Sequence, residues 1–274
     1  MNVLSLFDGI SCGQIALNRV GIKYDNYYAS EIDKYAIKVT QHNYPNTIQL
    51  GDITQITGSD LPKIDLLIGG SPCQSFSSVG NGSGFDGKSG LFWEFVRILN
   101  EVKPKYFLLE NVVMKKEWKN IITKEMGINP FEICSSLFSA QKRKRLYWTN
   151  IPFDNDIKDA GILLDDIIDH SLEEYKIPKS WEIYVPTHLP KYCDPYNKKE
   201  IKDKSTTLRT NCYNGNMWIK TKEAYRNLTR RETELLQTLP IGYTEIISEN
   251  QAKKCLGNGW TIDVIAHIFK NIKL

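Results

Sequence analysis

The sequence contains no long hydrophobic run and no segment that resembles a leader peptide. No stretch reaches the ~18 uninterrupted apolar residues that a membrane-spanning helix needs. Met1 leads directly into the strand-like segment NVLSLF, without a basic and apolar prelude. These absences exclude a membrane-embedded class of protein and predict a cytoplasmic protein with no membrane partner.

Cysteine and histidine are too dispersed to form a metal site or a disulfide framework. The four histidines do not pair at ligand spacing with one another or with a carboxylate. The six cysteines lack the short paired spacings of zinc sites and stand singly at Cys12, Cys73, Cys134, Cys193, Cys212 and Cys255. We therefore expect free thiols and no bound metal.

Composition favours a soluble globular protein with one large core. Of the 274 residues, 41% are hydrophobic and 24% are charged, which excludes general disorder and a fibrous architecture. A chain of this length can bury one substantial core and still form a smaller lobe. The net charge of +3 is too small to prove nucleic-acid binding, although QKRKR at 141–145 concentrates basic charge.

The first half of the chain alternates strand-like and helix-like segments, the pattern of a doubly wound α/β sheet. Helix-like segments such as CGQIALNRVG and LFWEFVRILNEVKP separate the strands. Seven strands are predicted near 2–7, 25–31, 47–52, 64–70, 105–111, 131–139 and 145–151. Only QKRKR joins the last two strands, and it is too short for a crossover helix, so these strands should be antiparallel neighbours.

The alternation fails between about residue 151 and residue 204, which indicates an additional lobe. Helical signals return at LTRRETELLQTLP, where Thr229 and Glu232 have the spacing of a capping box. The segment WTIDVIAHIFKNI then predicts a final helix with a buried face. We predict a discontinuous larger domain at 1–150 plus 250–274 and a smaller lobe at 151–249.

Glycines and carboxylates follow the first three predicted strands. Gly9 and Gly13 follow the first strand and permit a tight turn that a cofactor can approach. Glu31 ends the second strand, where α/β folds place a carboxylate against ribose hydroxyls, and Asp52 ends the third. Each carboxylate alone could merely cap a helix. The three strand ends together predict a nucleoside cofactor.

Cys73 and Glu110 follow the fourth and fifth predicted strands. A lone cysteine is usually a buried small hydrophobe, and a lone glutamate is often a helix cap. Ligands of open α/β sheets bind at the carboxyl ends of the strands, so this thiol and this carboxyl group should share one site with the cofactor.

Five segments carry a resemblance to a known family, namely SPCQSFS, ENV, QKRKR, LTRRETELLQTLP and GNGWTIDVIAHI. They follow one another in the order of motifs of the DNA cytosine-5 methyltransferases, and the sequence resembles that family along nearly its whole length except 151–204. LFDGISCG, ASEID and GLFWEF resemble the catalytic domain of the animal de novo enzymes, whereas the short chain is more like a bacterial or phage enzyme. The resemblance implies a Rossmann-like class I methyltransferase fold, with a target-recognition lobe within 151–249.

The resemblance also implies an enzyme that methylates carbon 5 of cytosine in double-stranded DNA, with S-adenosylmethionine as donor and S-adenosylhomocysteine as product. Cys73 would be the nucleophile, Glu110 the acid that engages the base, and Arg143 and Arg145 the basic groups beside it. The implied cofactor-binding residues are Phe7, Asp8, Gly9, Ile10, Gly13, Glu31, Ile32, Asp52, Ile53, Gly70, Pro72, Asn258 and Trp260. The expected DNA contacts are Ser75, Ser77, Arg209 and Asn211. In the first motif, Ser11 and Cys12 replace the glycine pair that is common in bacterial members.

Chemistry supports these roles independently. Carbon 5 of cytosine is a poor nucleophile, and addition of a thiolate to carbon 6 enables it to attack a sulfonium methyl group. A carboxyl group that holds a proton towards ring nitrogen 3 assists this addition. Because a base inside a duplex exposes neither face, the target nucleotide must be flipped out.

Other functions remain open at this point. An RNA cytosine methyltransferase, such as one acting on tRNA, would have the same architecture, and a non-catalytic DNA-binding homologue would share the fold. A nicotinamide-dependent oxidoreductase is disfavoured because the sequence lacks a full glycine fingerprint. A cognate restriction endonuclease is a further candidate partner.

Overall fold

A computed structural model of the chain describes residues 1–72, 90–172, 185, 187–210, 217–222 and 224–273. These residues belong to two compact units. Unit 1 comprises Met1–Ile133, Lys144–Asn155 and Val264–Leu274, and unit 2 comprises Cys134–Arg143 and Asp156–Asp263. The division predicted from the sequence, into a larger domain at 1–150 plus 250–274 and a smaller lobe at 151–249, stays a prediction. Among the described residues, no helix is both long enough and apolar enough to cross a membrane.

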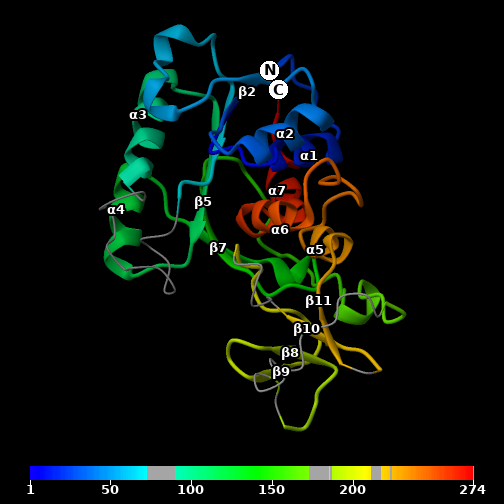
Figure 1. The fold of residues 1–274 in the computed structure, drawn as a ribbon. Helices are drawn as coiled ribbons and strands as arrows, with labels where there is room; N and C mark the ends of the chain where they lie inside the picture. Colours follow the sequence, from blue (N-terminus) through cyan, green and yellow to red (C-terminus); the bar gives the residue numbers. More distant parts are fainter. Residues whose placement is uncertain (73–89, 173–184, 186, 211–216, 223, 274) are drawn as a thin grey trace. The chain divides into compact units, whose positions relative to one another are not determined.

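Unit 1 is built on a mixed seven-stranded sheet with the order β3-β2-β1-β4-β5-β7-β6 (Figure 1). The strands are β1 (Asn2–Leu6), β2 (Asn26–Ser30), β3 (Ile48–Gln49), β4 (Leu66–Gly69), β5 (Tyr106–Val112), β6 (Phe131–Cys134) and β7 (Lys144–Thr149). All seven predicted strands are confirmed, although β3 and β6 are shorter than predicted. Strands β1 to β5 are parallel, whereas β7 runs antiparallel to β5 and lies beside β6, as predicted.

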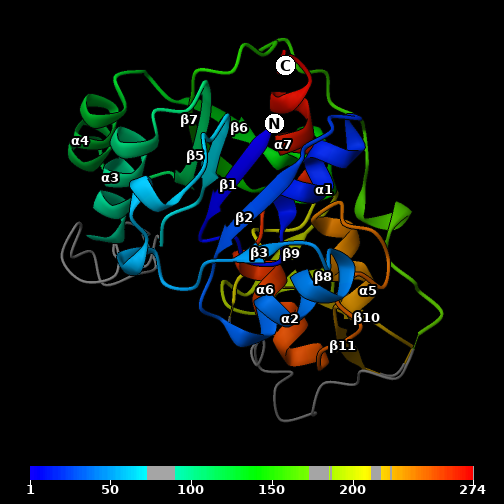
Figure 2. The same ribbon diagram turned by 90° about the horizontal axis from the view of Figure 1, so that it is seen from above.

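Helices cover both sides of this sheet. They are α1 (Cys12–Arg19), α2 (Lys34–Asn43), α3 (Phe92–Val102), α4 (Lys116–Met126) and α7 (Ile262–Phe269). The part of α7 from Val264 onwards belongs to unit 1. Figures 1 and 2 show α1 and α7 on one side of the sheet and α3 and α4 on the other. The α3 residues Phe92, Phe95 and Ile98 are fully buried in a core that includes Trp148. Their spacing of three residues sets the apolar stripe that this helix buries.

Unit 2 contains a four-stranded antiparallel sheet with the order β11-β10-β8-β9. Its strands are β8 (Tyr192–Asp194), β9 (Lys199–Ile201), β10 (Trp218–Lys220) and β11 (Tyr225–Asn227), and its helices are α5 (Arg230–Leu236) and α6 (Glu249–Asn258). The predicted capping box is confirmed, because Thr229 Oγ1 accepts from the Glu232 amide at 3.2 Å and Glu232 Oε2 accepts from the Thr229 amide at 2.8 Å.

A buried ion pair joins β11 to α5 in unit 2. Nη2 of Arg226 lies 2.7 Å from Oε1 of Glu232, and their side chains are 0% and 1% exposed. The same two side chains engage the main chain of Asp169, because Arg226 donates to its carbonyl and Glu232 accepts from its amide at 3.0 Å. The pair therefore connects a strand, a helix and a loop that are distant in the sequence.

Candidate active site

The turn between β1 and α1 has a backbone that few residue types adopt easily. Phe7, Gly9 and Ser11 have φ angles of 57°, 60° and 60°, in the left-handed region. The buried carboxylate of Asp8 holds this turn, because it accepts from Ser11 Oγ at 2.7 Å and from the Tyr27 hydroxyl at 2.9 Å. Burial raises the pKa of Asp8 to about 6, in spite of these hydrogen bonds.

Glu31, which follows β2, joins two turns through its carboxylate. Its Oε2 accepts from the Gly9 amide at 2.8 Å, and its Oε1 accepts from the amides of Ile32 and Asp33 at 2.7 and 2.8 Å. A carboxylate has about four acceptor positions, so a further donor such as a ribose hydroxyl can still bind. The side chain of Ile32 is 73% exposed beside it and offers an apolar surface to a base.

The end of β3 lies next to the end of β2. The Leu50 amide donates to the Ala29 carbonyl at 2.8 Å, and Ser30 Oγ donates to the Gly51 carbonyl at 2.8 Å. These contacts bring the exposed Asp52 close to the Glu31 turn. Asp52 Oδ1 also accepts from the Thr54 amide at 2.9 Å. Two carboxylates therefore follow neighbouring strands at the same edge of the sheet.

Glycine at position 13 allows α1 to approach the sheet closely. A Cβ atom there would lie 2.3 Å from Cδ1 of Ile68 and 2.7 Å from the hydroxyl of Tyr27. The predicted cofactor residues Ile10 and Ile53 are 0% and 4% exposed. Their side chains belong to the apolar core beneath the turns, and their contact with a cofactor stays a prediction.

Asn111 ties the end of β5 to the segment that follows β4. Its Nδ2 donates to Oγ of Ser71 at 3.0 Å and to the Ser71 carbonyl at 3.3 Å, and Asn111 is 1% exposed. Because β4 and β5 are parallel neighbours, this contact fixes the approach to Pro72 beside Glu110. Cys73, the next residue after Pro72, lies outside the described residues.

Glu110 and Arg145 form an ion pair between adjacent strands. Nε of Arg145 lies 2.9 Å from Oε1 of Glu110, and the two side chains are 13% and 11% exposed. Arg145 stands opposite Val112 in the register of β5 and β7, so Glu110 is its diagonal neighbour on the same face. The sequence expectation that Arg145 stands beside Glu110 agrees with this geometry.

Arg143 has different contacts from those expected. The sequence predicts that Arg143 engages the target base beside Arg145, but Arg143 is 4% exposed. Its guanidinium donates to the carbonyls of Leu208, Gly257 and Gly259 at 3.2, 3.2 and 3.0 Å. A buried guanidinium must satisfy its donors, and these three carbonyls of unit 2 do so. Arg143 therefore has a structural role.

A buried polar network surrounds the Arg143 segment in unit 2. Gln141 Nε2 donates to Oε1 of Gln237 at 3.1 Å, and Gln237 Nε2 donates to the Leu256 carbonyl at 2.7 Å. Thr261 Oγ1 donates to the same Gln237 oxygen at 2.8 Å. The network positions the chain around the predicted cofactor residues, the exposed Asn258 at the end of α6 and the half-buried Trp260. Sequence reasoning missed both glutamines, although each lies inside a motif.

Arg209 is the one predicted DNA contact that lies within the described residues. Its guanidinium carbon stands 4.7 Å from the ring centroid of Tyr196, whose side chain is 68% exposed. The buried Asp194 carboxylate accepts from the amides of Tyr196 and Asn197 at 2.9 and 3.2 Å and so fixes the turn after β8. Sequence reasoning missed Tyr196. The other predicted contacts, Ser75, Ser77 and Asn211, lie outside the described residues.

The described residues contain no group of three or more His, Cys, Asp or Glu side chains that could hold a metal ion. Predicted residues lie at five strand ends of unit 1, those of β1 to β5, namely Phe7, Asp8, Gly9, Gly13, Glu31, Ile32, Asp52, Gly70, Pro72 and Glu110. This arrangement can hold a nucleoside at the ends of β1, β2 and β3, and it can present the Glu110 carboxyl group at the end of β5. Asn111 and Ser71, which connect β5 to β4, were not predicted.

The sequence profile described as C-5 cytosine-specific DNA methylase matches residues 1–180 and 173–274. The chain is 41% identical over 142 residues to the orphan methyltransferase M.SPRI of Bacillus phage SPR, a match that covers 51% of this chain and 31% of that protein. It is 30% identical to the type II methyltransferase M1.ScrFI of Lactococcus lactis subsp. cremoris, covering 96% and 75%. It is 29% identical to the type II methyltransferase M.HhaI of Haemophilus parahaemolyticus, covering 99% and 94%.

Solved structures of low sequence identity share the fold. A mutant of DNMT2 from Spodoptera frugiperda has a TM-score of 0.74 at 20% identity, with 98% of each chain covered. The Entamoeba histolytica methyltransferase EhMeth has a TM-score of 0.75 at 18% identity, covering 100% of this chain and 99% of that one. The chain spans only about a third of M.SPRI, but most of the two bacterial relatives.

Proposed function

The chain belongs to the C-5 cytosine-specific DNA methylase family, and we propose on this premise that it transfers a methyl group from S-adenosylmethionine to carbon 5 of a flipped-out cytosine in double-stranded DNA. The contact between Asn111 and Ser71 carries the proposal. It fixes the segment that leads to Cys73 beside the strand end that presents Glu110. A nucleophile and an acid on these two strand ends can act on the same pyrimidine.

The residues at the ends of β1, β2 and β3 fit a nucleoside cofactor. The Glu31 carboxylate is oriented by three main-chain amides, and the exposed Ile32 beside it suits the face of an adenine. Asp52 offers an acceptor for an amino group. The turn at Gly9 lets the main chain approach the ligand. When bound, S-adenosylmethionine supplies an electrophilic methyl group on a sulfonium sulfur.

Residues of the β4 and β5 ends would activate the base. The Cys73 thiolate forms a bond to carbon 6 of cytosine, while Glu110 carries a proton towards ring nitrogen 3. Electron density then gathers at carbon 5, which would take the methyl group as its bond to the sulfonium sulfur breaks and S-adenosylhomocysteine is left. A base, which we infer to be a water molecule, then removes the carbon 5 proton, and the bond between Cys73 and carbon 6 breaks. Arg145 holds the Glu110 carboxyl group in position throughout.

We infer that Arg209 and Tyr196 contribute to DNA binding from unit 2. A guanidinium stacked on an exposed ring is pre-oriented, because the ring limits its rotamers. Such a pair can meet a phosphate or a base edge. Ser75, Ser77 and Asn211 remain predicted DNA contacts.

Two experiments test the proposed function. Cys73→Ser should abolish transfer of labelled methyl groups to duplex DNA and should leave cofactor binding, measured by calorimetry, largely intact. A duplex that carries 5-fluorocytosine should form a covalent complex with the wild-type chain, because fluorine cannot leave as a proton. Methyl transfer to tRNA but not to duplex DNA would instead identify an RNA enzyme. Duplex binding without any methyl transfer would identify a non-catalytic homologue.

A partnership with a restriction endonuclease remains a prediction. Two bacterial relatives bear the name type II methyltransferase and the phage relative is called orphan, so names of both kinds occur among similar proteins. DNA that this chain has methylated should resist an endonuclease encoded beside it. Cleavage of fully methylated DNA by that endonuclease would refute the partnership.

A further inference from the structure

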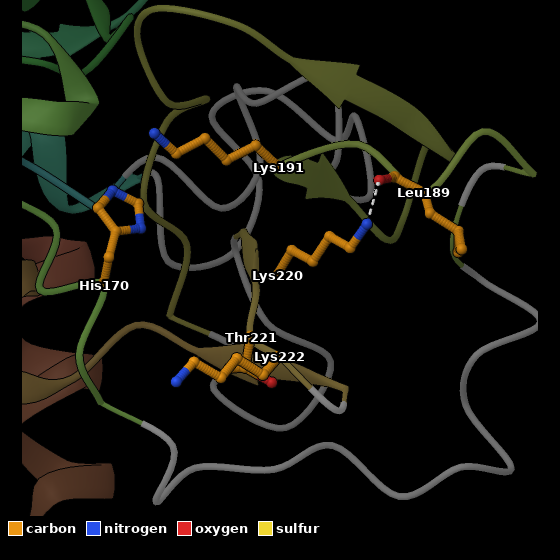
Figure 3. Close-up of a pocket in the computed structure, with 6 residues that line it drawn as sticks. All are labelled: His170, Leu189, Lys191, Lys220, Thr221 and Lys222. Atoms are coloured by element: carbon orange, nitrogen blue, oxygen red, sulfur yellow. Dashed lines mark hydrogen bonds between the residues drawn. The ribbon is translucent and has the colours of Figure 1, made fainter.

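Unit 2 carries a surface pocket of about 370 Å³ whose lining is mostly basic (Figure 3). The lining residues are His170, Leu189, Lys191, Lys220, Thr221 and Lys222. Leu189 is the only apolar side chain among them. It is 53% exposed and has a φ angle of 49°, in the left-handed region that leucine rarely adopts. Backbone strain of this kind clusters at functional sites.

The lysine side chains that line the pocket extend in two directions. In Figure 3, the side chains of Lys191 and Lys222 extend towards the side on which His170 lies, and Lys220 extends the other way. Lys220 Nζ donates to the Leu189 carbonyl at 3.4 Å. The lining therefore presents ammonium groups from two sides.

Asp165 is the acidic partner of this lining within the described residues. Its Oδ1 lies 2.7 Å from Nζ of Lys191 and 3.3 Å from Nε2 of His170. The Tyr192 hydroxyl bonds to the same oxygen and lies 2.9 Å from that ring nitrogen. Hydrogen bonds from Lys191 and Tyr192 lower the pKa of Asp165 to about 2, so this carboxylate stays charged and keeps the cluster in place.

The charge balance of the pocket favours an anion. Among the described residues, the lining contributes three lysine ammonium groups and the neighbouring Asp165 one carboxylate, so these side chains together carry positive charge even with His170 neutral. Lys191 is 52% exposed and His170 is 38% exposed, so a group on a large molecule can reach them. The Thr221 hydroxyl adds a neutral donor. Phosphate oxygens match this mixture of ammonium groups and a hydroxyl.

We propose that this pocket binds a phosphate group of the DNA backbone when the chain engages its substrate. Lys191, Lys220 and Lys222 neutralise the phosphodiester, and the exposed Leu189 packs against the adjoining sugar. The site fixes the position of the duplex and reads no base, because phosphate contacts carry no direct sequence information. This inference rests on the proposed function, since it assigns part of the substrate contact to a pocket outside the strand ends of unit 1.

Salt dependence of DNA binding tests this inference. The affinity of the full chain for a fluorescein-labelled duplex is measured by anisotropy over a series of salt concentrations. The wild-type chain is compared with Lys222→Gln and with the double variant Lys220→Gln/Lys222→Gln. Each phosphate contact that is lost should reduce the slope of log affinity against log salt by about 0.9. Lys202→Gln is the matched control, because Lys202 is exposed on the same unit and does not line the pocket.

The outcomes separate this inference from alternatives. A shallower slope in the pocket variants but not in Lys202→Gln supports a backbone phosphate site. Equal slopes in all four proteins overturn it, as does an equal decrease in Lys202→Gln, which would show only a general charge effect. Saturable binding of inorganic phosphate that is lost in Lys222→Gln, with an unchanged DNA slope, would assign the pocket to a free phosphate and overturn the DNA assignment.

Methyl transfer by the same proteins shows which proposal has failed. If the wild-type chain methylates duplex DNA and the pocket variants keep its salt slope, only the pocket inference is wrong. If the wild-type chain neither methylates nor binds the duplex, the proposed function fails and this inference fails with it. Thermal unfolding of each variant confirms that the lysine replacements leave the fold intact.

Discussion

The Nε atom of Arg145 lies 2.9 Å from Oε1 of Glu110, and both side chains are almost fully enclosed. The strand β7 therefore holds the carboxyl group that we propose acts on the target base. Neither residue is close to the other in the sequence. Antiparallel pairing of β5 with β7 alone brings them together.

Replacement of Glu110 by Gln should remove the proton carrier while its volume stays the same. We expect methyl transfer to fall by about 10²- to 10⁴-fold, the usual contribution of general acid catalysis. Turnover on duplex DNA with a labelled donor measures this loss. Cofactor affinity, measured by calorimetry, should not change, because the cofactor residues lie at other strand ends. A turnover equal to that of the wild-type chain would refute the role of Glu110.

Asn111→Ala should slow the formation of the covalent complex without weakening cofactor binding. The substitution removes the donor that holds Ser71 and leaves buried polar atoms without a partner, at a cost of about 1 to 3 kcal/mol. The rate of complex formation with a 5-fluorocytosine duplex measures the effect. Ser71→Ala is the matched control, because it removes only one of the two acceptors and should slow the rate less. An unchanged rate in Asn111→Ala would show that the contact does not position Cys73.

Asp8 should make stability depend on pH. Burial raises its pKa from 3.8 to about 6, so the folded chain binds the proton more tightly than the unfolded chain. The contribution of the neutral carboxyl group is complete below pH 3.8 and is lost as pH rises through 6. The unfolding free energy of Asp8→Asn minus that of the wild-type chain should therefore increase by about 2 to 3 kcal/mol from acidic to neutral pH. Denaturant unfolding at several pH values measures the gain, and parallel curves for the two proteins would contradict it.

The buried pair of Arg226 and Glu232 should be important for the stability of unit 2. Glu232→Ala leaves a buried guanidinium without its partner, which should cost about 3 to 5 kcal/mol. The double variant Arg226→Met/Glu232→Leu should recover part of this loss, because it removes both charges. The exposed pair of Lys144 and Glu132 provides the control, and Glu132→Ala should cost less than about 1 kcal/mol. Equal losses in the two glutamate variants would show that burial of the pair is unimportant.

Alanine should destabilise the chain at both Gly13 and Gly9, but for a different physical reason at each position. In Gly13→Ala the new Cβ collides with Ile68 and Tyr27, and such overpacking typically costs about 1 to 3 kcal/mol. In Gly9→Ala the space is open, and the left-handed backbone alone should cost about 1 to 2 kcal/mol. Thermal unfolding compares the two variants, and calorimetry should show weaker cofactor binding in both. A Gly13→Ala protein as stable as the wild-type chain would contradict the close packing of α1.

Structural features that depend on only a few neighbouring residues were predicted well. The capping box of Thr229 and Glu232 is confirmed, because its two hydrogen bonds need only residues three positions apart. The seven strands of unit 1 are confirmed, because strand-like segments alternate with helix-like segments and turn residues along this part of the chain. The strands of unit 2 were missed, since β8 to β11 have three residues each and a run of three shows no alternation.

The role of Arg143 was predicted wrongly because its contacts come from remote segments. Its carbonyl acceptors belong to residues 65 to 116 positions away, and nothing in QKRKR indicates which arginine will turn inward. The contact between Asn111 and Ser71 spans 40 positions and was missed for the same reason. A side chain's partners depend on which strands are neighbours, so they follow from topology.

The sequence by itself determined the α/β class, the order of the strands along the chain and the family, because hydrophobic periodicity and the spacing of the motifs are local properties. Only the tertiary structure decided that Arg145 contacts Glu110, that Arg143 is buried on carbonyls, and that three lysines line one pocket in unit 2. These facts depend on distances between residues far apart in the chain. Packing and the satisfaction of buried polar groups set those distances, and neither can be read from a local pattern.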